Sequence, residues 1–156
     1  MRKISEYTLK KSSEHIYYEA WMLFEVMRLL LTSKDQLFVN ILLESFSIHS
    51  RNLFDFLYPK SKSKNDDILV YDYIQFKKLY NINKTKKKEL NFIIRKANKQ
   101  VAHLTYSRNK FGTKNKPWPF VSIGNKMRKS LIAFYDALPE KYKQWYYFIQ
   151  LKEILK

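Results

Sequence analysis

The residues best suited to chemistry on a polyanion lie close together in one segment: Glu44, His49, Arg51 and Asp55. An arginine can clamp a phosphate through two parallel N–H donors, and a histidine can move a proton near neutral pH. At helical spacing, Arg51 has Glu44 and Asp55 on its own side of the helix, where a carboxylate can orient the guanidinium. Arg51, His49 and Glu44 are therefore candidate catalytic residues.

The segment that carries them, residues 36–57, has the pattern of a long central helix. Ser33 and Gln36 have the spacing of a capping box, and the next helix breaker is Pro59. Apolar side chains cover most of the circumference, which is typical of a buried helix. The exception is a polar stripe: Asn40, Glu44, Ser47, Arg51 and Asp55. Unpaired charge in such a place is costly, so the stripe indicates a site; the alternative is an ion network on an exposed seam, with His49 a satisfied core histidine.

Two more long helices are predicted to position these residues. Residues 12–31 form an amphipathic helix capped by Ser12 or Ser13, and a short link makes it the antiparallel neighbour of the central helix. A third helix runs from Thr85 to about His103, with an apolar stripe on one side and cations on the other. His103 therefore ends a cationic helix face, and it is the fourth candidate catalytic residue, provided that this helix packs beside the central one.

The remaining segments complete an all-α pattern. Asp66 and Asp67 are predicted to begin a short helix over about 68–80, and residues 122–137 form another helix. Pro139 suits the first turn of a last helix. Its predicted inner face holds Tyr142, Trp145, Tyr146 and Ile149. We expect residues 1–156 to form a single all-α domain, an up-and-down bundle of four to five helices.

Composition narrows the function classes. Two glycines are too few for the Gly-rich loops of nucleotide-binding folds, and without cysteine there is no thiolate ligand or nucleophile. The spacing of the three histidines does not match a metal site, so we expect no metal and no cofactor. The sequence contains no apolar run of membrane-spanning length, which predicts a cytoplasmic protein without membrane contact. A net charge of +16 favours RNA or another nucleic acid as partner; the alternative is a surface filled with lysine.

The positive charge is interleaved with aromatic residues over 105–120, where stacking surfaces alternate with cations. Single-stranded nucleic acid is bound by such combinations. The alternative is a loop that packs its aromatic side chains back onto the bundle. The candidate RNA-binding residues of the third helix and this segment are Arg95, Lys96, Asn98, Lys99, Arg108, Lys110 and Trp118.

Residues 44–57 and 98–108 together resemble bacterial proteins related to the HEPN superfamily. The resemblance implies a helical bundle, commonly a homodimer, that acts on RNA. Many such proteins are metal-independent ribonucleases of toxin–antitoxin or phage-defence systems; others bind RNA or act as scaffolds without catalysis. The family motif is an Arg, four to six residues, and a His. His103 fits its end, but Asn98 or Lys96 occupies the Arg position, and we expect Arg51 to supply the guanidinium.

Two expectations follow. The first is a metal-independent ribonuclease whose catalytic cleft lies at a dimer interface, with an antitoxin or another defence protein as a possible partner. The second is a helical bundle without catalytic activity that binds RNA, a nucleotide or another protein.

Overall fold

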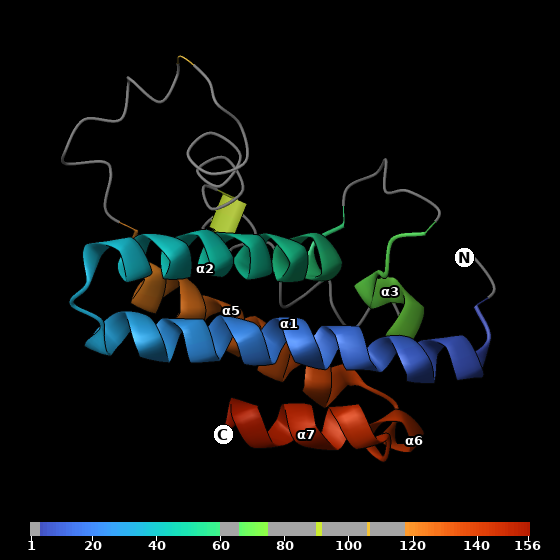
Figure 1. Ribbon diagram of the computed structural model, residues 1–156. Coiled ribbons are helices and arrows are strands. Elements are labelled where there is room, and N and C mark those ends of the chain that lie inside the picture. The colour runs from blue at the N-terminus through green and yellow to red at the C-terminus, as the bar shows by residue number, and fades with distance from the viewer. Residues whose placement is uncertain (1–3, 60–65, 75–89, 92–105, 107–117) are drawn as a thin grey trace.

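The computed structural model describes residues 4–59, 66–74, 90–91, 106 and 118–156. Its helices are α1 (Glu6–Thr32), α2 (Gln36–Leu57), α3 (Val70–Tyr73), α5 (Phe120–Ala137), α6 (Glu140–Lys143) and α7 (Tyr146–Leu155) (Figure 1). The described residues contain no strand. Buried apolar side chains from all the long helices form one hydrophobic cluster. The predicted all-α bundle is confirmed.

The helices α1 and α2 form an antiparallel hairpin (Figure 1), as predicted. Its caps differ from the prediction. The N-cap of α1 is Ser5, which accepts a hydrogen bond from the Thr8 amide, whereas Ser13 is buried inside the helix. The N-cap of α2 is Asp35, whose carboxylate accepts from the Phe38 amide at 2.7 Å.

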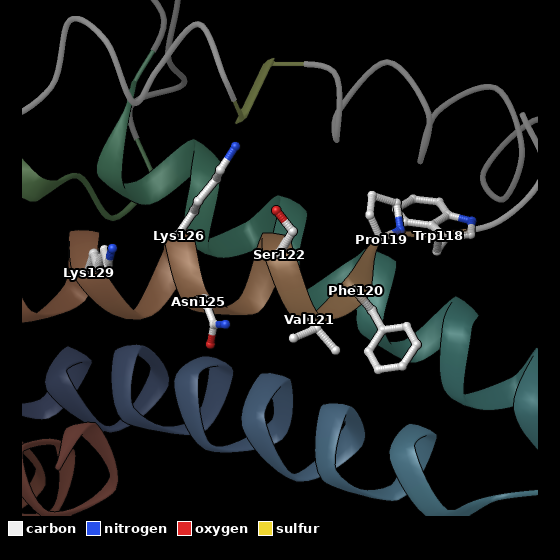
Figure 2. Close-up of a pocket in the computed structure, with 8 residues that line it drawn as sticks. All are labelled: Trp118, Pro119, Phe120, Val121, Ser122, Asn125, Lys126 and Lys129. Carbon is white, nitrogen blue, oxygen red and sulfur yellow. The ribbon is translucent and has the colours of Figure 1, made fainter.

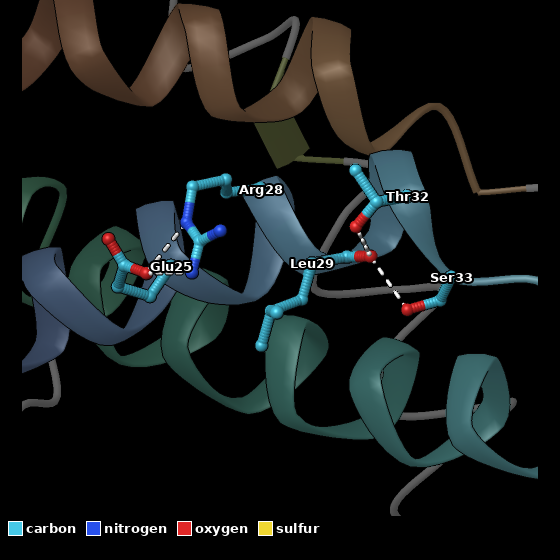
Figure 3. Close-up of polar contacts among 5 residues, drawn as sticks. All are labelled: Glu25, Arg28, Leu29, Thr32 and Ser33. Atoms are coloured by element: carbon cyan, nitrogen blue, oxygen red, sulfur yellow. Dashed lines mark hydrogen bonds and ion pairs between the residues drawn. The ribbon is translucent and has the colours of Figure 1, made fainter.

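Ser33 ends α1 and does not begin α2. Both its amide and its hydroxyl donate to the Leu29 carbonyl oxygen, and the Thr32 hydroxyl donates to the same oxygen (Figure 3). In the link between the helices a serine can close one helix or open the next. Asp35 is the stronger N-cap here because its carboxylate also suits the positive end of the helix dipole.

Helix α5 packs on both members of the hairpin, and α7 packs on α1 and α5. Phe46 of α2 contacts Phe120, and Phe56 contacts Phe134, so α2 and α5 run in the same direction. Gly124 of α5 faces Met27 of α1, where a Cβ atom would overlap the Met27 sulfur. The missing side chain therefore allows α5 to approach α1 closely.

The expectation that α2 is buried nearly all round is wrong. Leu37, Phe38, Ile41 and Ile48 are exposed, although the helix buries residues such as Phe46 and Leu53 completely or nearly so. Among the described elements, α1 and α5 pack most extensively on α2. Apolar composition showed that α2 belongs to a core, but not which of its apolar side chains the core would cover.

The C-terminal segment is broken and not one continuous helix. Pro139 precedes α6, and the chain restarts as α7 at the N-cap Trp145. This break changes the phase of the inward face, so Phe148, Leu151 and Leu155 are buried. Trp145 is buried as predicted, but Tyr146 and Ile149 are exposed.

The short helix α3 is capped differently from the prediction. Its N-cap is Leu69, whose amide donates to the Asp72 carboxylate at 2.8 Å. Asp66 and Asp67 are exposed and precede the cap. Of the helix predicted over 85–103, only residues 90–91 lie in the described part; both are helical, and Leu90 is completely buried.

Candidate functional site

The polar stripe of α2 is only partly a cluster of charges. Nε of Arg51 lies 3.7 Å from Oδ2 of Asp55, and both side chains are about two-fifths exposed. Glu44 is exposed two turns earlier, whereas Ser47 is buried and its hydroxyl donates to the Glu44 carbonyl oxygen. The Arg51 guanidinium is thus accessible to an anion and loosely held by one carboxylate.

His49 lies on a different side of the same helix. Its Nδ1 atom is 2.7 Å from the Glu19 carboxylate of α1, and the ring of Tyr18 meets it edge-on at 5.9 Å. Two residues along a helix turn the side chain by about 200°. The structure therefore buries His49 at the α1–α2 contact and does not bring it together with Arg51. This geometry is that of a core histidine with a hydrogen-bond partner.

The other predicted site residues lie outside the described residues, apart from Trp118. These are His103, Arg95, Lys96, Asn98, Lys99, Arg108 and Lys110. The shared cleft of Arg51 and His103 stays a prediction for this reason.

Trp118 lines a groove of about 690 Å³ beside the first half of α5 (Figure 2). The groove is lined by Trp118, Pro119, Phe120, Val121, Ser122, Asn125, Lys126 and Lys129. A volume of this size is within the range of ordinary ligand pockets. Its lining combines aromatic and aliphatic walls with hydroxyl, amide and ammonium groups.

Local sequence explains how α5 presents these polar groups. Ser122, Lys126 and Lys129 follow one another at intervals of four and three residues, so they lie on one side of α5. Figure 2 shows Ser122 and Lys126 pointing to the side away from α1, and Asn125 pointing towards α1.

The opposite side of the helix buries Ile123, Met127 and Leu131, which holds α5 in this rotation. Phe120 packs edge-on against Phe46 and fixes the start of the helix. The groove lining is therefore set by the same packing that positions α5 in the bundle.

The polar residues of α5 were not among the predicted RNA-binding residues, which lie in the third predicted helix and in the segment before α5. The signal was present as two lysines and two polar residues spaced over two turns, directly after Trp118 and Pro119. The lining of the groove suits a ligand that carries both a phosphate and a flat base, such as a nucleotide. Lysine ammonium groups and the positive end of a long helix both attract phosphate, and the apolar walls can receive a base.

Two further features bear on the expected chemistry. Within the described part of the chain, histidine and acidic side chains do not gather in a group of three that could hold a metal. None of the helices described here is long and apolar enough to cross a membrane.

Comparison of the chain with protein-family models, with curated proteins and with solved structures finds no match.

Proposed function

We propose that the protein acts on RNA: it binds single-stranded RNA in the α5 groove and cleaves it without a metal ion. The observation that carries the binding is the groove itself, where Trp118 and two lysines line one cavity in a chain of net charge +16. Polyanions are attracted by the overall field, and the groove supplies a place where one nucleotide can be held.

In this proposal Lys129, which is exposed, contacts a phosphate, and Lys126 contributes to the same field. Ser122 and Asn125 offer hydrogen bonds to sugar or base edges. Trp118 is nearly buried, so it forms a wall for a base and not an open stacking platform. Such contacts are tolerant of sequence, because the phosphate and the base faces are common to all nucleotides.

The cleavage step follows from the HEPN resemblance and uses His103. The imidazole accepts the proton of a ribose 2′-hydroxyl, and that oxygen attacks the adjacent phosphorus. The bond to the 5′-oxygen of the next nucleotide breaks, and that oxygen takes up a proton. The products are a 2′,3′-cyclic phosphate and a 5′-hydroxyl. Arg51 stabilises the charge that develops on the phosphate oxygens. The same resemblance supports a homodimer and a partner protein in a toxin–antitoxin or phage-defence module.

Binding is tested with a fluorescein-labelled single-stranded oligoribonucleotide and fluorescence anisotropy. Lys129→Ala should weaken binding several-fold. The matched control is Lys152→Ala, which removes an exposed lysine of α7 and the same charge but lies outside the groove lining. Equal weakening by the two variants would mean that RNA binding depends only on the net charge, and it would contradict the proposal that RNA binds in the groove.

Cleavage is tested separately with the purified protein in EDTA, and the end groups of the products are determined. The wild type should release a cyclic phosphate end, and His103→Ala should release none while its circular dichroism spectrum and RNA affinity are unchanged. If the wild type binds RNA in the groove and leaves it intact, the protein is the non-catalytic RNA-binding bundle.

A further inference from the structure

Methionine supplies all the sulfur of this chain, which contains four methionines and no cysteine. The described residues include Met22 and Met27 on α1 and Met127 on α5. Met127 is completely buried, whereas Met22 and Met27 are half-buried. A dissolved oxidant therefore reaches the two methionines of α1 more readily than it reaches Met127.

The sulfur of Met27 lies at the contact between α1 and α5. It is so close to Gly124 that a Cβ atom on residue 124 would overlap it. Gly124 is buried in the interior of α5, and it contributes only backbone to the contact. The Met27 side chain thus fills the space that the missing side chain of Gly124 leaves.

The next contact along the same two helices joins them to a third. Phe24 lies three residues before Met27 on α1, and Arg128 lies four residues after Gly124 on α5. The Arg128 guanidinium lies over the Phe24 ring, 4.2 Å from its centre, and Nη1 donates to the Ile154 carbonyl oxygen of α7 at 2.7 Å. A shift of α5 at Gly124 would displace Arg128 as well, because both residues belong to one helix.

We infer that Met27 is a site of reversible oxidation by peroxide, and that its sulfoxide loosens α5 from α1. In the forward step a lone pair of the sulfur attacks one peroxide oxygen, the O–O bond breaks, and the second oxygen leaves as water with both protons. The sulfur is oxidised and the peroxide is reduced. In the reverse step a methionine sulfoxide reductase removes the oxygen as water, and thiols of the reductase are oxidised to a disulfide.

The added oxygen has no favourable position at this contact. The amides in the interior of α5 already donate to carbonyl oxygens of their own helix, so an oxygen that stays beside Gly124 is a polar group without a donor. If the oxidised Met27 side chain turns outward to water instead, it leaves a void beside Gly124, which has no side chain to fill it. Both outcomes weaken the packing of α5 on α1.

Oxidation of Met27 also affects the α5 groove, and this consequence rests on the proposed binding of RNA there. Asn125, the residue after Gly124, lines the groove and points towards α1 (Figure 2). Ser122 and Lys129 belong to the same helix, so they move with it when α5 shifts from α1. The oxidised protein should therefore bind RNA more weakly, and reduction should restore the affinity.

The test treats the whole protein with hydrogen peroxide, locates the added oxygen by peptide mass spectrometry, and measures urea unfolding. Oxidation should raise the equilibrium constant for unfolding of the wild type about tenfold. Methionine sulfoxide reductases with dithiothreitol should reverse the change. Met27→Leu conserves the volume and apolar character of the side chain, so it should fold like the wild type and lose little stability in peroxide. The matched control is Met22→Leu, a half-buried methionine of the same helix, which should stay as sensitive as the wild type.

Three results would overturn the inference: a Met27 that peroxide leaves unmodified, an oxidised Met27 with an unchanged unfolding curve, or equal loss of stability in Met27→Leu and the wild type. Anisotropy with the labelled oligoribonucleotide is a separate readout. Lower stability with unchanged RNA affinity would refute the effect on the groove. If the untreated protein does not bind RNA, the proposed function fails, while urea unfolding still decides whether oxidation loosens α5.

Discussion

The carboxylate of Glu19 on α1 lies 2.7 Å from Nδ1 of the buried His49 on α2. The two residues are 30 positions apart in the chain, and the contact ties the middle of one long helix to the middle of the next. His49 is 8% exposed, so its ring nitrogen has little access to water if the carboxylate is removed. This polar contact fixes the position of α1 relative to α2, which apolar packing alone would define less closely.

Glu19→Ala should therefore destabilise the protein more than an ordinary surface substitution. The loss leaves a buried imidazole nitrogen without its partner, which costs about 1–3 kcal/mol in the free energy of unfolding. Glu25→Ala is the control, because it removes an exposed pair with Arg28 that is worth at most about 1 kcal/mol. Urea unfolding of the two variants measures the difference. Equal midpoints would show that the Glu19–His49 contact contributes no more than a surface pair.

The buried hydroxyls of Tyr58 and Ser130 are 2.9 Å apart and join α5 to the end of α2. Ser130 also donates to the Lys126 carbonyl oxygen, so the Tyr58 hydroxyl is the donor between them. Ser130→Ala leaves that tyrosine hydroxyl without its acceptor, whereas Tyr58→Phe leaves serine with its own donor bond. We expect Ser130→Ala to lower the free energy of unfolding by about 1–3 kcal/mol and Tyr58→Phe by about 1 kcal/mol. Thermal unfolding of the two variants measures this difference. The reverse order would contradict the assigned direction of the bond.

The close approach of α5 to α1 at Gly124 predicts a steep dependence on side-chain size. Gly124→Ala places one methyl against the flexible Met27 side chain, and the gain in helix propensity of about 0.5–1 kcal/mol offsets the contact. Gly124→Val adds two more methyl groups that force the helices apart, at a cost of about 1–3 kcal/mol. Chemical denaturation of both variants checks this. A valine tolerated as well as alanine would mean that the two helices are not held at this distance.

Burial raises the pKa of Tyr58, Tyr71 and Tyr73 above the ordinary tyrosine value, most strongly for Tyr73, where Asp72 adds to the effect. Below pH ~10 these groups are protonated in both folded and unfolded chains. Above it the unfolded chain loses its protons first, so the stability falls as the pH rises.

Tyr73→Phe should flatten this alkaline loss of stability. Denaturation at a series of alkaline pH values checks it, with Tyr7→Phe, an exposed residue, as control. An unchanged slope for Tyr73→Phe would mean that the Tyr73 phenol ionises like a free tyrosine.

RNA binding in the α5 groove predicts a characteristic salt dependence. Each phosphate neutralised on a single strand contributes about 0.7 to the slope of log affinity against log salt. Lys129→Ala should therefore lower the slope by about that amount, and Lys152→Ala should leave it unchanged. Anisotropy titrations at several salt concentrations give both slopes. A slope that falls equally in both variants would assign the salt dependence to the overall charge.

The sequence by itself determined the helices that have long, uninterrupted patterns. The bounds predicted for α2 are those observed, and α5 begins two residues before the predicted Ser122. Apolar periodicity is a local property of the chain and follows from helix geometry, so it can be read without knowing the neighbours. Caps were less predictable, because Ser33 and Asp35 can both cap and only the path of the chain selects between them.

Tertiary structure decided which side of each helix is covered, and therefore which polar residues meet. It placed His49 against Glu19 and apart from Arg51, although all three suit the same chemistry. It also set the rotation of α5 that leaves Lys129 exposed in the groove lined by Trp118, and it left Ile41 and Ile48 exposed on the hairpin. A helical pattern gives the directions of side chains around one axis, but the position of the next helix depends on contacts between residues far apart in the chain.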